Sequence, residues 1–397
     1  MKRLFVLLLA NVLICACACA QKKDIEQAQT YIKSGKNLDK AEESMRKLLK
    51  DSANRANLKV WQTLTEAIRL QYEQGNEKLY LKQKSDTASL FQTNYKMFLA
   101  YEAMDSVDML PNKKGRVEPK FRKKNAEYLN NYRRNLYNGG VFFISKQKYD
   151  VAFKMLDAYI DCAFQPLFSG NRYDPKSKHA LSAAYLATLC GVKLGNDDIA
   201  LKHSTEALLY TPGREKTMQF LANIYSGRKE TQKYEDVLKQ GVDEFPKSEF
   251  FFTRLVDFYN GKNQLDSALY VADKSLQKDT VNTLFLYAKS NILLNKGDYD
   301  GSIAMADKVI ALDDSFADAH YTAGVAYLNK AFEAEKQASR KNKTQITKFY
   351  KSALGYMEKY RALAPDQKDK WAPALYNIYL NLNMGKKFEE ITKLLQN

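Results

Sequence analysis

The sequence repeats itself with a period of about 34 residues, and this period constrains the fold more than any other feature of the chain. Ala268 and Ser302 stand one period apart in matching surroundings, and Ala200 stands two periods before Ala268. Each period holds two stretches in which apolar residues recur with helical spacing, joined by a short turn. One such helix pair cannot bury both of its apolar faces, so neighbouring pairs must stack on one another.

Small residues occupy the positions at which the two helices of a pair are expected to cross. On the first helix these residues are Gly140, Thr188, Ala222, Ser290 and Gly324. On the second helix they are Ala41, Ala152, Ala200, Ala268, Ser302 and Ala353. A large residue recurs near the turn, as Leu38, Tyr149, Leu265, Tyr299 and Phe388. Prolines that would end the second helix stand at Pro111, Pro212, Pro246 and Pro365.

This combination of period and columns resembles the tetratricopeptide-repeat (TPR) family over nearly all of residues 24–397, least clearly over 24–135. The resemblance implies an all-α fold, a right-handed superhelical solenoid of antiparallel helix pairs without strands. We expect eight or nine pairs, the last of them capping the stack. They lie at about 24–54, 57–111, 127–166, 177–212, 214–246, 247–280, 281–315, 316–365 and 371–397.

The repeats suggest a division of the chain into three parts. These are a signal peptide (1–20), divergent helical repeats (21–135) and a TPR solenoid (136–397). The second pair is long, so either its helices are extended or its loop is enlarged. A further insertion interrupts the solenoid at about 329–348. Insertions into repeats usually gather on one face of the stack.

The first 20 residues have a basic start, an apolar centre and small residues at the end, which are the three parts of a secretory signal. Ala18–Ala20 provides the spacing of a cleavage site before Gln21. The alternative is a lipoprotein, with Cys17 or Cys19 carrying the lipid. We therefore expect an exported protein, either periplasmic or lipid-anchored to the outer membrane. No later stretch has the roughly 18 apolar residues of a membrane span.

Two cysteines lie beyond the signal, Cys162 and Cys190. In the repeat register Cys162 ends one helix, and Cys190 lies well inside the next, antiparallel helix. At about 1.5 Å per residue, their Cα atoms should be more than roughly 10 Å apart. A disulfide allows about 7 Å at most. We expect two buried free thiols.

The sequence contains no recognisable catalytic or metal-binding motif. The three histidines, His179, His203 and His320, have no second histidine or cysteine at metal-ligand spacing. His203 and His320 are more consistent with solvated or hydrogen-bonded helix residues. An enzyme would need a non-repeat domain of roughly 100 residues or more. We therefore predict no enzymatic activity, cofactor or metal.

A basic segment at 113–124 stands out in a chain whose net charge is +16. It contains Lys113, Lys114, Arg116, Lys120, Arg122, Lys123 and Lys124 against one acidic residue. The segment is either a docking patch for an anionic partner, such as an envelope surface or an acidic protein, or a solvated loop. The export signal disfavours nucleic acid as the partner.

A column of tyrosines stands three residues before the small position of the first helix. Its members are Tyr137, Tyr185, Tyr287, Tyr321 and Tyr376, and polar residues near the column are Asn223, Asp257 and Asn291. The resemblance implies that this column lines or borders the concave groove, where it could hold an extended peptide or a helix. The alternative is that the tyrosines only pack one repeat against the next.

Together these features predict a non-enzymatic scaffold or adaptor of the bacterial cell envelope that binds other proteins through the concave repeat groove. The alternative is an envelope-attached glycan- or peptidoglycan-binding protein. The sequence does not identify the partner.

Overall fold

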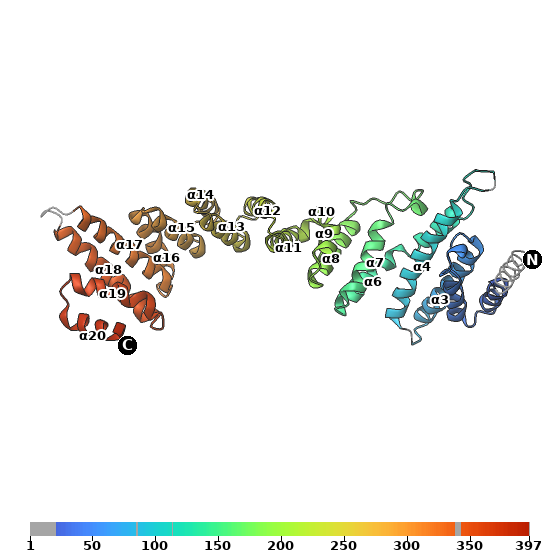
Figure 1. Ribbon diagram of the computed structural model, residues 1–397, viewed down its shortest axis with the longest axis horizontal. Coiled ribbons are helices and arrows are strands. Elements are labelled where there is room, and N and C mark those ends of the chain that lie inside the picture. The colour runs from blue at the N-terminus through green and yellow to red at the C-terminus, as the bar shows by residue number, and fades with distance from the viewer. Residues whose placement is uncertain (1–20, 85, 113, 338–342, 397) are drawn as a thin grey trace, which may run out of the picture. The chain divides into compact units, whose positions relative to one another are not determined.

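A computed structural model describes residues 21–84, 86–112, 114–337 and 343–396, and within these ranges the secondary structure is helical, with no strand (Figure 1). The predicted signal peptide at 1–20 lies outside the described residues. The helices gather into two compact units, one up to Thr217 and one from Met218, so that the division falls within α11 (Arg214–Gly227).

The first unit is built from helix pairs. A helix through residues 21–34 is followed by α2 (Leu38–Leu48). The next pairs are α3 (Leu58–Tyr80) with α4 (Thr87–Asp108) and α6 (Arg133–Ser145) with α7 (Tyr149–Asp161). Then α8 (Lys178–Lys193) packs against α9 (Asp197–Lys202) and α10 (Ser204–Ala207). The short α5 (Arg122–Asn130) precedes α6.

The second unit continues the pattern. After α12 (Thr231–Glu244) come α13 (Glu249–Gly261) with α14 (Leu265–Leu276) and α15 (Thr283–Lys296) with α16 (Tyr299–Leu312). The last pairs are α17 (Ala317–Lys336) with α18 (Lys343–Leu363) and α19 (Lys368–Asn381) with α20 (Gly385–Gln396). With α11 and α12 counted as one pair and α5 left out, the described helices give nine successive pairs, within the eight or nine that the sequence predicts.

The small residues of both predicted columns are buried. Ala200, Ala268 and Ser302 have no exposed surface, and the hydroxyl of Ser290 donates a hydrogen bond of 2.8 Å to the carbonyl of Ser302. Gly191, one turn after the predicted Thr188, packs directly against Ala200 of α9. A Cβ atom on Gly191 would lie 2.2 Å from the amide nitrogen of Ala200. Small residues therefore let the two backbones of a pair come close together.

Most turns within the pairs, among those that the structure describes, use a residue in the left-handed backbone conformation. Gly195 and Gly297 have φ of 63° and 80°, as expected for glycines that end a helix. Gln147 and Asn263 take the same role without being glycines, with φ of 57° and 55°. Gly261 is the last residue of α13, and the turn that follows it uses Asn263.

The insertions lengthen helices. Helices α3 and α4 have 23 and 22 residues, and α17 and α18 have 20 and 21, whereas α13 has 13. Part of the predicted insertion at 329–348, residues 338–342, lies outside the described residues. None of the described helices is both long enough and apolar enough to cross a membrane.

Ion pairs join consecutive helix pairs in the second unit. Lys296 at the end of α15 pairs with Asp266 at the start of α14, and Lys330 of α17 pairs with Asp300 of α16. Each lysine follows its aspartate by 30 residues, and the second ion pair stands one repeat period after the first. We call this recurring contact the Asp–Lys ladder.

Candidate functional site

The tyrosine column lies half-buried, and each ring contacts another aromatic ring. Tyr287 lies 5.1 Å from Phe316, Tyr321 lies 5.0 Å from Tyr360, and Tyr376 lies 4.9 Å from Phe388, measured between ring centroids. In the first unit Tyr185 contacts Tyr210 and Tyr137 contacts Tyr159, at 5.6 and 5.7 Å. These rings therefore pack helices against one another within the protein.

The hydroxyl of Tyr137 is 3.0 Å from the hydroxyl of Ser182. Among the polar residues predicted near the column, Asn223 and Asp257 are exposed. Asn291 is half-buried, and its side-chain oxygen accepts a hydrogen bond of 3.1 Å from Thr322. Two of the three polar candidates are thus accessible to a partner.

The basic segment forms an exposed loop that ends in α5. Lys114, Arg116 and Lys120 are exposed within the loop. The side-chain oxygen of Asn112 accepts hydrogen bonds from the amides of Lys114 and Arg116, which shapes the first part of the loop. Lys113 lies outside the described residues.

The far end of the basic segment is fixed to α4. Arg122 forms a forked ion pair with Asp105, 2.7 Å at its shortest, and Asp105 is only 4% exposed. The amide of Phe121 donates to Asp108 at 2.8 Å. Arg122 is therefore engaged inside the protein, while Lys123 and Lys124 remain exposed.

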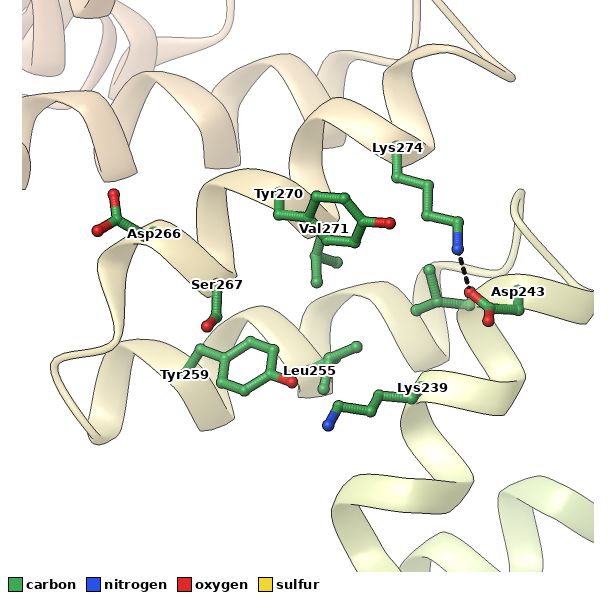
Figure 2. A pocket seen from close by; sticks show the side chains of 10 residues that line it. Lys239, Asp243, Leu255, Tyr259, Asp266, Ser267, Tyr270, Val271 and Lys274 are labelled. Carbon is green, nitrogen blue, oxygen red and sulfur yellow. Dashed lines mark hydrogen bonds and ion pairs between the residues drawn. The ribbon is translucent and has the colours of Figure 1, made fainter.

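A cavity of about 440 Å³ lies in the second unit where α12, α13 and α14 meet. Figure 2 shows Tyr270 and Lys274 projecting from α14 beside it, with Lys239 and Asp243 on α12. We call this the α12–α14 cavity. Val242, Leu255 and Val271 are buried apolar residues of its lining.

The rim of the α12–α14 cavity combines an exposed aromatic ring with charges of both signs. The ring of Tyr270 is 66% exposed. The ammonium of Lys274 lies 2.5 Å from Asp243, and this hydrogen bond raises the pKa of Lys274. The same ammonium is 5.9 Å from the centre of the Tyr270 ring.

No repeat column of the sequence marks this cavity. The helix α13 turns Leu255 and Tyr259 toward it, two residues on either side of the predicted groove residue Asp257. A step of two residues rotates by about 200° around a helix. The cavity and Asp257 therefore lie on different faces of α13. The available signal was Tyr270 on the second helix of a pair, because the residues one helical turn away from it are polar: Asp266, Ser267, Asp273 and Lys274.

The groups that could do chemistry are mostly hydrogen-bonded or buried. His320 is buried, and its Nε2 lies 3.0 Å from the carbonyl oxygen of Asp314, as expected of a hydrogen-bonded helix residue. Cys162 and Cys190 are free and buried, which confirms the prediction of two buried thiols. Burial raises the pKa of each thiol to about 12. A thiol that stays protonated is a poor nucleophile.

No family model and no curated protein matches this chain. Solved structures similar to it include part of a TPR-containing protein from Cytophaga hutchinsonii, at 13% identity over 65% of this chain and 93% of that one, with a TM-score of 0.45. Others are PilW, a widely conserved type IV pilus biogenesis factor (16% identity, 54% of this chain, 92% of that one, TM-score 0.38), and MamA from Desulfovibrio magneticus RS-1 (14%, 48%, 97%, 0.35).

The nine helix pairs, with their buried small residues and their regular spacing along the sequence, decide the fold. It is an all-α repeat of the TPR type. Because all three TM-scores are below 0.5, the neighbours carry no conclusion about partner or activity.

Proposed function

We propose that this protein is a non-enzymatic scaffold that binds other proteins through the surfaces of its stacked helix pairs. The observation that carries the proposal is the α12–α14 cavity. Its volume of about 440 Å³ can receive one large apolar side chain of a partner. Buried apolar lining, an exposed tyrosine and a charged rim are together typical of the central part of a protein interface.

The charges of the rim favour a polypeptide partner over a polyanion. Lys239 and Lys274 are balanced by Asp243 and Asp266, so the cavity has no excess of either sign. A polyanion would need a surplus of cations, whereas a peptide can present charges of both signs around one apolar anchor. Tyr270 provides contact area and a polar tip at low cost in conformational entropy.

The location of the protein, a second binding surface and the division of the chain are proposed from the sequence. We propose that the protein acts in the cell envelope, because residues 1–20 have the composition of a secretory signal. The tyrosine column and its exposed polar neighbours, Asn223 and Asp257, would form a second binding surface. We also propose that the chain consists of a signal peptide (1–20), divergent helical repeats (21–135) and a repeat solenoid (136–397). The alternative partner, an envelope glycan, would use the same aromatic rings for stacking on sugars.

A site-specific crosslinking experiment tests the cavity. A photoreactive amino acid replaces Tyr270 in intact cells, and it replaces the 85% exposed Tyr80 in a matched control. We expect a defined protein adduct from position 270 that is absent from position 80 and is reduced by Val242→Glu. Adducts with cell-wall fragments alone would support the glycan alternative. No adduct from position 270 would contradict the proposal for this cavity.

The groove requires a separate test, because its tyrosines also pack the helices. Replacing Tyr185, Tyr287 and Tyr321 together with serine should weaken capture of the partner. It should also lower the Tm, because ring packing is lost, while the helical content of the folded protein stays intact. The matching triple phenylalanine variant keeps the ring packing and removes only the hydroxyl groups. Equal capture by the wild type and the serine variant would remove the groove from the proposal.

A further inference from the structure

Two acidic residues and a histidine converge between consecutive helix pairs of the first unit. Asp157 and Asp161 lie one helical turn apart on α7, and His203 follows the end of α9. The Nε2 atom of His203 is 2.7 Å from Oδ1 of Asp157. One possible ligand atom from each of the three side chains lies within 4.8 Å of the other two. The three residues come from two different helix pairs.

The histidine distinguishes this cluster from a surface patch of acids. His203 is only 6% exposed, and its ring faces Phe153 at 6.5 Å between centroids. Its Nε2 atom points to Asp157 in place of solvent. The buried imidazole would be a nitrogen ligand in a fixed position. The two carboxylates are partly exposed, so their oxygen atoms can change position when an ion binds.

A positive charge already occupies the space between the carboxylates. The ammonium of Lys202 lies 2.5 Å from Asp157 and 3.7 Å from Asp161. The Lys202 side chain is 45% exposed, so it can turn outward into water without crossing the protein interior. The cluster has more acidic groups than Lys202 alone can neutralise.

We propose that Asp157, Asp161 and His203 form a binding site for a divalent transition metal ion of the Zn²⁺ type, which displaces the Lys202 ammonium. Imidazole and carboxylate are common Zn²⁺ ligands, at about 2.0–2.2 Å from the ion. Mg²⁺ prefers sites made of oxygen alone, so the histidine selects against it. The three ligand atoms, which now lie within 4.8 Å of one another, would have to move closer together to reach these distances.

The site would join neighbouring helix pairs. α7 is the second helix of one pair, and α9 belongs to the second half of the next pair. A metal ion shared by them fixes their separation more firmly than a flexible lysine does. Ion binding to the folded state alone also raises the stability of the protein in proportion to the logarithm of the metal concentration.

Zinc binding is tested on tag-free protein that has been treated with a chelator and dialysed. Zn²⁺ is titrated by calorimetry, and thermal unfolding is followed with and without it. We expect one Zn²⁺ per chain and a higher Tm, whereas Mg²⁺ has no effect. His203→Gln and Asp161→Asn should each weaken binding at least tenfold, and the control His179→Gln, on an exposed histidine, should leave it unchanged.

Lys202→Gln separates a metal site from a simple network of ion pairs. If Zn²⁺ must displace the ammonium, this variant should bind Zn²⁺ several-fold more tightly than the wild type. If the cluster is only an ion-pair network, Lys202→Gln lowers the Tm and Zn²⁺ restores none of the loss. Absence of binding in both proteins, or binding that survives in His203→Gln with Asp161→Asn, would overturn the proposal.

Discussion

The Asp–Lys ladder of the second unit and one ion pair of the first unit differ in how deeply their acidic residues are buried. In the second unit the Asp–Lys ladder lies on the surface, where Asp266 and Asp300 have side chains that are 92% and 83% exposed. In the first unit Asp105 is 4% exposed and binds Arg122 through both of its oxygens. The ladder recurs with the repeat, whereas the Asp105–Arg122 pair occurs once. Exposed pairs contribute little singly, but a buried pair is costly to break.

The difference follows from how regular the repeats are. From α14 to α17 the 34-residue step of the repeat is kept, so one weak contact can be used again. The long α4 and the loop after it break that regularity. Contacts that do not recur in other repeats therefore fix this loop to α4. Asp105 and Asp108 do this through Arg122 and the amide of Phe121. Irregular segments of a solenoid therefore depend on specific buried contacts.

The largest effect should come from Ala200→Asp in the first unit or Ala268→Asp in the second, because both sites are fully buried at helix crossings. An unpaired buried carboxylate costs several kcal/mol, comparable to the net stability of a domain (about 5–15 kcal/mol). We expect unfolding of the neighbouring helix pairs in each case, measured by circular dichroism on heating. The crossings are common to both units, so the two variants should be similarly damaged. A normal melting curve for either would show that the repeat register is wrong.

The next effect tests the buried pair. Asp105→Ala leaves Arg122 without its main acceptor and should lower the free energy of unfolding by about 3 kcal/mol. Chemical denaturation measures the loss. Replacing both residues, as Asp105→Leu with Arg122→Leu, should restore part of the stability, because no charge then stays unpaired. A loss below about 0.5 kcal/mol for Asp105→Ala would place this pair in the class of the surface ladder.

Glu102 should make the stability of the first unit depend on pH. Its pKa rises from 4.5 to about 7 in the folded protein because of burial and the charge of Asp161. The folded state therefore favours the protonated form, and stability is lost as the pH rises between these values. Glu102→Gln should remove the loss and gain about 2 kcal/mol relative to the wild type at pH 8, but little at pH 4. Denaturation at both pH values measures this, and an equal gain at both would contradict the assignment.

The smallest effect should come from the ladder. Lys296→Ala removes one exposed pair and should cost about 0.5 kcal/mol or less, with an effect that shrinks at high salt. Lys330→Ala should add independently to it, since the two pairs share no residue. Denaturation of the single and double variants in low and high salt gives these values. A cost for either variant well above the range of exposed ion pairs would mean that the two units do not differ in the way described.

The repeat architecture could be predicted from the sequence because the two helices of each pair cross at a similar short distance. This crossing requires a small residue at the same place in every repeat. Ala200, Ala268 and Ser302 mark those crossings, and their spacing by one period or its multiple is visible without a structure. The nature of the insertions could not be predicted, because helical spacing of apolar residues continues through α3 and α4 and allows either longer helices or a longer loop.

The candidate site was much less accessible to sequence reasoning. Tyr270 belongs to no column of the repeat, and its exposure depends on how α12 and α14 pack around α13. The Arg122–Asp105 pair joins residues 17 positions apart, for which no periodic pattern exists. Composition therefore suggested that Arg122 belongs to an open basic patch, whereas its guanidinium is turned toward α4.

The Asp–Lys ladder also has a consequence for how such a chain can change its length. Because each lysine pairs with an aspartate 30 residues earlier, removal of residues 267–300 would place Lys330 at that same distance from Asp266. The crossing residue Ser302 would take the place of Ala268 in the same step. One whole repeat can be excised or duplicated in a single genetic event, and the new junction already carries matching partners.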